Sequence, residues 1–261
     1  MYLSHLLVDV GTDPDRPRPG RTWLRQPYRV HQRLCMAFPS DGRKQADPQF
    51  LKPFAHDGFE RQVDTPRTAH EGFLYRVDPF PLATALPGQE PDRPSSMGHG
   101  RAVILVQSAI EPDWDYAFHN ACHLLAARPE TRVLDMTFSP DEVCCFRLRA
   151  NPTAKMRVRA DRSPARNGVR VGLYTEDEQL AWLQRKAQAG GFSVVSCHIV
   201  PEGKVLSRKG GEAPEDRMQH LAVRFDGVLR VTDPDCLLNT LRNGIGSAKA
   251  FGFGLLSLAR A

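Results

Sequence analysis

Tyr28 and His31 have side chains that could perform chemistry, and they are three positions apart in a stretch that reads as a helix beginning at Pro27. Residues at this spacing lie side by side on one helix face. The apolar stripe of this helix runs between Val30 and Leu34, so both side chains are expected a quarter-turn or more from the core. Histidine titrates near neutral pH and can transfer protons, although a lone surface histidine usually has no such task. The pair is a candidate catalytic site.

This pair has the chemistry needed to cleave RNA without a metal ion. One group must take the 2′-OH proton, another must protonate the leaving 5′-oxygen, and nearby cations must stabilise the phosphorane. The pair lies within a stretch, Arg16 to Arg33, that holds six arginines and no acid. Catalysis on a polyanion is therefore the hypothesis for this helix.

A metal centre is not expected. His119 and His123 have the i, i+4 spacing of a zinc pair on a helix, but the glutamate of an H-E-x-x-H motif is missing and no His/Cys cluster supplies a clear third ligand. The six cysteines lack C-x-x-C spacing, which indicates reduced thiols. A catalytic dyad of a nucleophilic cysteine and a histidine remains an alternative, although no neighbouring residues favour it. We expect no metal and no cofactor.

The glycine-rich segment 244–254 reads as a loop between a helix and a strand. Its order and spacing fit neither a dinucleotide-binding fingerprint nor a Walker A loop. A flexible run of backbone N–H groups with one lysine and one hydroxyl can approach a phosphate closely, although the glycines could instead only allow tight packing. The RNA-binding candidates here are Gly244, Gly246, Ser247, Lys249, Gly252 and Gly254.

Positive charge is concentrated in parts of the chain. The net charge is +5, and 28 of the 35 cationic residues are arginine, which binds phosphate bidentately. Between 147 and 170, seven arginines and one lysine face a single acid. Such clustering favours a nucleic-acid partner over a solvated basic face. The candidates for RNA binding are Arg147, Arg149, Lys155, Arg157, Arg159, Arg166 and Arg170.

The elements that must position these residues follow one order twice. In the first half we expect strand, helix, two strands, helix and strand, at 2–9, 27–38, 73–77, 102–106, 113–127 and 132–138. In the second half we expect a strand at 143–150, followed by an added hairpin rich in arginine at 155–171. A helix that begins with a capping box at Thr175 comes next, and then strands at 192–199 and 221–231 on either side of a polar loop. A helix at 234–241 and a strand at 253–258 complete the order.

This repeated β-α-β-β-α-β order predicts an α+β fold of tandem ferredoxin-like (RRM-like) domains, 1–140 and 141–261. The chain is 41% hydrophobic, enough for a proper core, and has no apolar run of membrane-spanning length. Its N-terminus lacks the features of a secretory signal. A cytoplasmic protein with no membrane contact is expected.

Five blocks of sequence, in order along nearly the whole chain, resemble the CasE subfamily of CRISPR repeat endoribonucleases from type I-E systems. They are Met1-Tyr2-Leu3-Ser4, Tyr28-Arg29-Val30-His31-Gln32 with Leu34 and Phe38-Pro39, Phe146 to Pro152, Ala181 to Lys186, and Gly244 to Lys249 continuing through Gly254 to Leu258.

The resemblance implies an enzyme that binds the stem-loop of the CRISPR repeat and cuts the precursor at the 3′ base of the hairpin. Cleavage would need no metal and would leave 2′,3′-cyclic phosphate and 5′-hydroxyl ends. The product would stay bound as mature guide RNA, with other Cascade subunits as partners. By position, the resemblance places the catalytic histidine at His31, its neighbouring tyrosine at Tyr28, the glycine-rich loop at 244–254 and the stem-gripping region at 147–170.

Two segments depart from the family pattern: 10–25 is longer than expected and 79–100 has the character of an insertion. Two other functions stay open on sequence alone. One is a non-catalytic module that binds an RNA hairpin within a ribonucleoprotein, and the other is a metal-dependent phosphodiesterase using His119 and His123.

Overall fold

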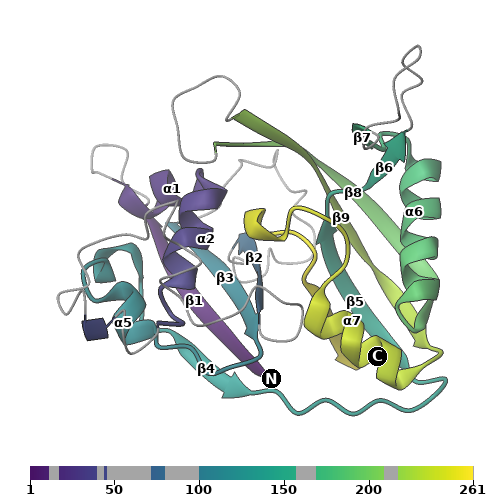
Figure 1. The fold of residues 1–261 in the computed structure, drawn as a ribbon, viewed down its shortest axis with the longest axis horizontal. Helices are drawn as coiled ribbons and strands as arrows, with labels where there is room; N and C mark the ends of the chain where they lie inside the picture. The colour runs from purple at the N-terminus through teal and green to yellow at the C-terminus, as the bar shows by residue number, and fades with distance from the viewer. Residues whose placement is uncertain are drawn as a thin grey trace, which may run out of the picture. The chain divides into compact units, whose positions relative to one another are not determined.

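The computed structural model describes residues 1–11, 18–39, 44–45, 72–79, 100–156, 169–208 and 217–260. The chain divides into two compact units, Met1–Asp135 and Met136–Ala261, and each is described by itself (Figure 1).

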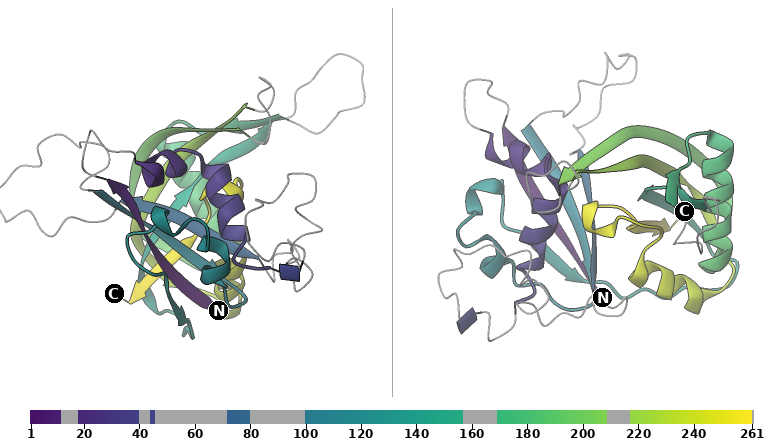
Figure 2. Two further views of the ribbon diagram at one scale, coloured as in Figure 1. Left: turned by 90° about the vertical axis from the view of Figure 1, so that its left-hand side faces the viewer. Right: turned by 45° about the horizontal axis from the view of Figure 1, so that its top comes forward.

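The first unit contains strands that alternate with short helices. Its elements are β1 (Tyr2–Gly11), α1 (Pro19–Leu24), α2 (Pro27–Cys35), β2 (Phe73–Pro79), β3 (Gly100–Ser108), α5 (Trp114–Phe118), the 3-10 helix η1 (Cys122–Leu124) and β4 (Glu130–Val133). The strands form one sheet in the order β2-β3-β1-β4, and every neighbouring pair is antiparallel. The helices α1 and α2 lie across one face of this sheet (Figure 1 and Figure 2).

The core of this unit follows from alternation along the strands. Leu6, Val8 and Val10 of β1 are buried, and the same face of β3 contributes Ala102, Ile104 and Val106. Successive strand residues point to opposite faces, so one face of the sheet carries the apolar set. Val30 and Leu34, one helical turn apart on α2, cover that face and are fully buried. Each such side chain contributes about 1.5–3 kcal/mol of burial free energy.

The helix expected at 113–127 is wrong in length, because α5 ends at Phe118. Arg33 Nη1 donates to the Ala117 carbonyl at 3.0 Å and to Asn120 Oδ1 at 2.9 Å. The Ala121 N–H, which would bond to the Ala117 carbonyl in a continuing helix, bonds to the Phe118 carbonyl instead. The last strand is also shorter than 132–138, because the pairing of β4 with β1 ends at Val133.

The second unit repeats the order with an added hairpin. Its elements are β5 (Val143–Ala150), β6 (Thr153–Met156), β7 (Val169–Gly172), α6 (Glu176–Ala189), β8 (Phe192–Arg208), β9 (Arg217–Val231), α7 (Pro234–Asn243), the 3-10 helix η3 (Lys249–Phe251) and β10 (Leu256–Arg260). The main sheet has the order β10-β5-β9-β8, again antiparallel, and β6 pairs with β7 separately.

Both main sheets therefore place the four strands of a βαββαβ unit in the spatial order 4-1-3-2. This is the tandem ferredoxin-like architecture that the sequence predicted. The capping box of α6 is also confirmed: the Thr175 hydroxyl accepts from the Glu178 N–H, and the Glu178 carboxylate accepts from the Thr175 N–H.

The hairpin of β8 and β9 is longer than expected. The register continues from Phe192↔Val231 to Arg208↔Arg217, with irregularities at Val194/Ser196 and Pro201/Gly203. Lys204 and Arg208, expected in a polar loop, lie in β8 itself. The two strands curve as one ribbon in Figure 2. Among the described helices, none is long and apolar enough to cross a membrane.

Candidate catalytic and RNA-binding site

His31 and Tyr28 lie together on α2 as the sequence predicted, with ring centroids 6.2 Å apart. Both side chains are half-buried rather than pointing freely into solvent. The imidazole is stacked on two rings of strand β2: Phe73 at 5.4 Å and Tyr75 at 6.3 Å between centroids. These two aromatic rings, which the sequence did not reveal, therefore set the plane of the His31 ring; we call them the aromatic wall.

Two further contacts involve the first and the last residue of α2. The Tyr75 hydroxyl donates to the carbonyl of Pro27, the first helical residue, at 2.9 Å. Cys35, one turn after His31, places its sulfur 3.6 Å from His31 Nε2 and 3.9 Å from Nδ1. Cys35 is buried, as its i, i+4 position on the core side of the helix requires. The i, i+4 spacing could have revealed Cys35, whereas Phe73 and Tyr75 are about 40 residues away in the chain.

The arginines near this helix have different environments. Arg33 is engaged with the end of α5, and burial lowers the pKa of its guanidinium. Arg25 and Arg29 are exposed. The basic stretch counted from the sequence therefore contains at least one arginine with a structural role. Arg16 lies outside the described residues.

Arg147 and Arg149 on β5 are paired with acids of the same sheet. Arg147 Nε lies 2.6 Å from Asp226 Oδ1, and Arg149 Nε lies 2.6 Å from Glu202 Oε2. Burial alone would raise the pKa of Asp226, but hydrogen bonds and charge from Arg147 and Arg224 outweigh it and hold the pKa below its ordinary value. The charge of this strand, which looks strongly basic in sequence, is compensated across the sheet.

Lys155 and Arg170 are both exposed and directly opposite each other in the register of β6 and β7. Neither forms an ion pair with a residue in the described ranges. Like charges at facing positions repel, so this pair favours an anion nearby. Arg157, Arg159 and Arg166 lie outside the described residues.

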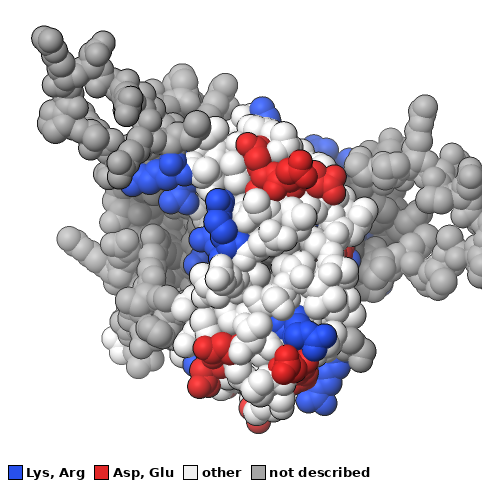
Figure 3. Space-filling view, turned by 90° about the vertical axis from the view of Figure 1, so that its right-hand side faces the viewer, with Lys and Arg blue, Asp and Glu red and all other residues white. Residues whose placement is uncertain are grey.

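The face that carries α6 is mixed in charge. The helix begins with Glu176, Asp177 and Glu178, and Figure 3 shows one large acidic group near the top of this face and further acidic groups, beside basic ones, near its bottom. An acidic first turn suits the positive end of the helix dipole. This face is a poor surface for a polyanion.

The glycine-rich loop is folded onto itself. The Ile245 N–H donates to the Gly254 carbonyl, and the Gly254 N–H donates to the Arg149 carbonyl of β5, each at 2.8 Å. Gly244, Gly246, Gly252 and Gly254 all have positive φ, which explains their residue type. Phe251 and Phe253 are buried beneath the loop. The expectation of a flexible run is therefore wrong, because the loop is held by backbone bonds and an apolar underside.

The two polar side chains proposed in this loop, Ser247 and Lys249, have different surroundings. Ser247 Oγ lies 3.5 Å from Asn151 Nδ2 at the end of β5. Lys249 is half-buried, and burial, together with the charge of Lys186, lowers the pKa of its ammonium.

His119 and His123 do not share a helix face, because α5 ends before the first and η1 contains the second. Both are exposed. In the described part of the chain, no three His, Cys, Asp or Glu side chains are grouped as metal ligands.

Comparison with known proteins gives matches along the whole chain. The family model described as CRISPR associated protein matches residues 1–260. The endoribonuclease Cse3 of Thermus thermophilus is 36% identical over 267 residues, covering 99% of this chain and all of that protein. The Cascade subunit CasE of Escherichia coli K12 is 38% identical over 262 residues, covering 99% of each.

Solved structures of related proteins have the same fold. A structure of endoribonuclease Cse3 bound to a 19-nucleotide RNA has a TM-score of 0.67 and 29% identity, over 99% of this chain and all of that one. A structure of Thermus thermophilus Cse3 with RNA representing a pre-cleavage complex has a TM-score of 0.62 and 26% identity, over 99% and 98%.

Proposed function

Since this chain belongs to the CRISPR associated protein family and, within it, to the CasE subfamily of type I-E systems, we propose that it is an endoribonuclease that processes CRISPR repeat RNA. It binds the stem-loop of the repeat and cleaves the precursor at the 3′ base of the hairpin. It then stays bound to the product guide RNA as a Cascade subunit.

The observation that carries the catalytic assignment is the placement of His31. Its ring lies beside Tyr28 on a helix anchored at its first residue, and an aromatic wall holds the imidazole plane. In this proposal His31 transfers a proton during attack of the 2′-OH on the phosphate, and Tyr28 orients the reacting groups. Arginines stay protonated at neutral pH, so they can stabilise charge but not shuttle protons.

The RNA-binding assignment begins at the β6–β7 hairpin. The facing cations Lys155 and Arg170 would lose their mutual repulsion on binding a phosphate. Arg157, Arg159 and Arg166 extend the same proposal from sequence alone. Arg147 and Arg149 contribute less directly, because Asp226 and Glu202 already neutralise them.

The glycine-rich loop adds backbone and side-chain groups to this interface, from Gly244, Gly246, Ser247, Lys249, Gly252 and Gly254. We assign the catalytic helix to a domain spanning 1–140, and the hairpin and loop to a domain spanning 141–261. A cytoplasmic location follows from the RNA substrate.

The test is cleavage of an end-labelled RNA of the repeat hairpin in the presence of EDTA. We expect a single cut that leaves a 2′,3′-cyclic phosphate, and no cut when the sugar just upstream carries a 2′-deoxy substitution. The deoxy RNA should still bind. Binding without cleavage of the natural RNA would identify a non-catalytic hairpin-binding module, and cleavage lost only with chelator would indicate a metal-dependent phosphodiesterase.

A further inference from the structure

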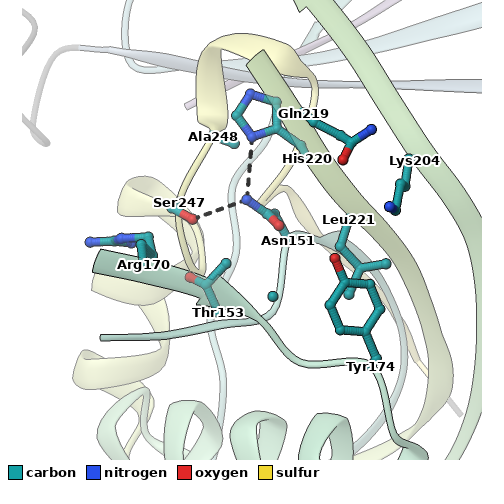
Figure 4. Close-up of a pocket in the computed structure, with 11 residues that line it drawn as sticks. Asn151, Thr153, Arg170, Tyr174, Lys204, Gln219, His220, Leu221, Ser247 and Ala248 are labelled. Carbon is teal, nitrogen blue, oxygen red and sulfur yellow. Dashed lines mark hydrogen bonds between the residues drawn. The ribbon is translucent and has the colours of Figure 1, made fainter. Parts of the chain in front are cut away.

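The second unit contains a pocket of about 280 Å³ that the catalytic proposal does not use. It lies where the β6–β7 hairpin, the β8–β9 hairpin and the glycine-rich loop meet. Its polar and aromatic lining includes Asn151, Arg170, Tyr174, Lys204, His220 and Ser247 (Figure 4). This volume is just below the roughly 300–1,000 Å³ of typical small-ligand sites, so the pocket can take a single small ligand and not a duplex.

Asn151 lies at the back of the pocket, with its amide nitrogen near two polar side chains. Its side chain is only 6% exposed, and its Nδ2 lies 3.4 Å from His220 Nδ1 and 3.5 Å from Ser247 Oγ. In Figure 4 the amide nitrogen points toward these two residues, and the carbonyl oxygen points away from them. The carbonyl oxygen of an amide in a pocket is an acceptor for N–H groups, such as those on the edge of a nucleobase.

His220 supports this orientation. Its ring packs on Phe251 at 4.5 Å between centroids, and burial lowers the pKa of the imidazole. A neutral ring carries one proton. An amide nitrogen can only donate, so a neutral His220 that accepts from Asn151 at Nδ1 carries its proton on Nε2. Nε2 is buried without a hydrogen-bond partner among the described residues.

Tyr174 supplies an aromatic surface. It is 61% exposed, unusually open for a ring of this size. The ring lies close to Gly172, where a Cβ would be 3.4 Å from its atoms, and Lys204 Nζ lies 6.0 Å from its centroid. Arg170 and Lys204 add two cations to the lining. An exposed aromatic ring, an amide and cations together are the elements with which proteins hold single-stranded nucleotides.

We propose that this pocket binds one unpaired nucleotide of the RNA, with the base stacked on Tyr174 and within reach of Asn151, and the phosphate on Arg170 and Lys204. The inference rests on the proposed function, because it requires a bound RNA hairpin with single-stranded flanks. It adds a readout of unpaired sequence to recognition of the stem.

The test combines variants of the protein with variants of the RNA. The RNA is the repeat hairpin with its flanks, made uncleavable by a 2′-deoxy sugar upstream of the cut, with one unpaired nucleotide at a time replaced by an abasic residue. The protein is the full chain with Tyr174→Ala, and the control is Val195→Ala, an exposed apolar side chain of β8 outside the pocket lining. Dissociation constants are measured for every combination.

We expect Tyr174→Ala to weaken binding of the intact RNA roughly tenfold, as loss of one base stack does. One abasic position should cause a similar loss, and Tyr174→Ala should add nothing further at that position, because both changes remove the same contact. Val195→Ala should bind like the parent.

Two results would overturn the inference. If Tyr174→Ala binds the intact RNA like the parent, or if its loss is the same for every abasic RNA, no single nucleotide occupies the pocket, although hairpin binding still stands. If the parent protein does not bind the hairpin at all, the proposed function fails and this inference fails with it.

Discussion

The imidazole of His31 is stacked on the phenyl ring of Phe73, with centroids 5.4 Å apart and ring planes 28° from parallel. Phe73 is the first residue of β2, an edge strand of the first sheet. The candidate catalytic group therefore has its plane set by a residue from a different element, so it is oriented before any substrate arrives. Such preorganisation is what a proton-transfer group needs.

The first prediction concerns proton transfer. Replacing His31 with Ala should lower the cleavage rate by about 10²–10⁴, the usual contribution of one acid–base group. Hairpin affinity should stay within a few-fold, because most of the binding energy comes from contacts elsewhere. Tyr28→Phe should cost less. Single-turnover cleavage and filter binding measure the two effects, and a His31→Ala protein that cuts at the parental rate would show that the assignment is wrong.

The second prediction separates a structural arginine from a surface one. Arg33→Ala leaves the Ala117 carbonyl and Asn120 without their donor, so the free energy of unfolding should fall by about 1–3 kcal/mol. Arg29→Ala, an exposed position on the same helix, should change it by less than about 0.5 kcal/mol. Urea unfolding of the two variants measures this difference, and equal effects would contradict a bracing role for Arg33.

Patterns within one element were readable from the sequence. The apolar strand at 2–9, the stripe of α2 and the capping box at Thr175 each depend on neighbouring residues, and all three are present in the structure. The repeated order of elements was enough to predict the fold. The pairing of Tyr28 with His31 was predictable for the same reason, since it depends only on helix geometry.

Features that join distant positions were not readable. Arg33 binds the carbonyl of Ala117 in α5, which is 84 residues away in the sequence. Arg147 binds Asp226, which is 79 residues away. A count of charges along a stretch of sequence treats both arginines as available to bind a polyanion. In the structure, each of them already has a partner within its own unit. The pocket around Asn151 was missed too, because its lining comes from segments that only the folded sheet brings together.

The third prediction uses the salt dependence of RNA binding. Arg170→Ala should reduce the slope of log K against log salt by about 1, because the residue would neutralise one phosphate. Arg147→Ala should leave the slope nearly unchanged, since Asp226 holds that guanidinium. Titrations at several salt concentrations compare the two. Equal slope changes would mean that Arg147 leaves Asp226 to contact RNA.

The fourth prediction concerns acid stability. The pKa of Asp226 lies below its ordinary value of 3.8 in the folded protein, so the carboxylate stabilises the fold above that value. This contribution is lost as the pH falls through the lowered pKa, because protonation removes the bonds with Arg147 and Arg224. The free energy of unfolding of Asp226→Asn should therefore be lower than that of the parent at pH 6, and the difference between the two proteins should narrow toward pH 3. A difference that is constant with pH would show that protonation of Asp226 does not control this part of the stability.

The last prediction asks whether the glycine-rich loop needs its glycines for conformation, packing or RNA. Gly246 has φ +86°, and a Cβ there would lie 3.1 Å from the buried Trp182 ring. Gly203 in β8 has nearly the same φ, +85°, with nothing within 4 Å of a Cβ. Gly203→Ala therefore isolates the backbone penalty, about 1–2 kcal/mol, whereas Gly246→Ala adds an overpacking cost of about 1–3 kcal/mol.

The temperature of thermal unfolding should be highest for the parent, lower for Gly203→Ala and lowest for Gly246→Ala. RNA affinity, measured well below the unfolding temperature of each variant, should fall for Gly246→Ala and stay at the parental value for Gly203→Ala, because only the first displaces the loop that carries Ser247. If Gly246→Ala is destabilised but binds RNA as the parent does, the loop serves packing alone and its residues leave the proposed interface. If both variants lose affinity equally, backbone strain anywhere in this unit weakens binding, and the loop has no special part in it.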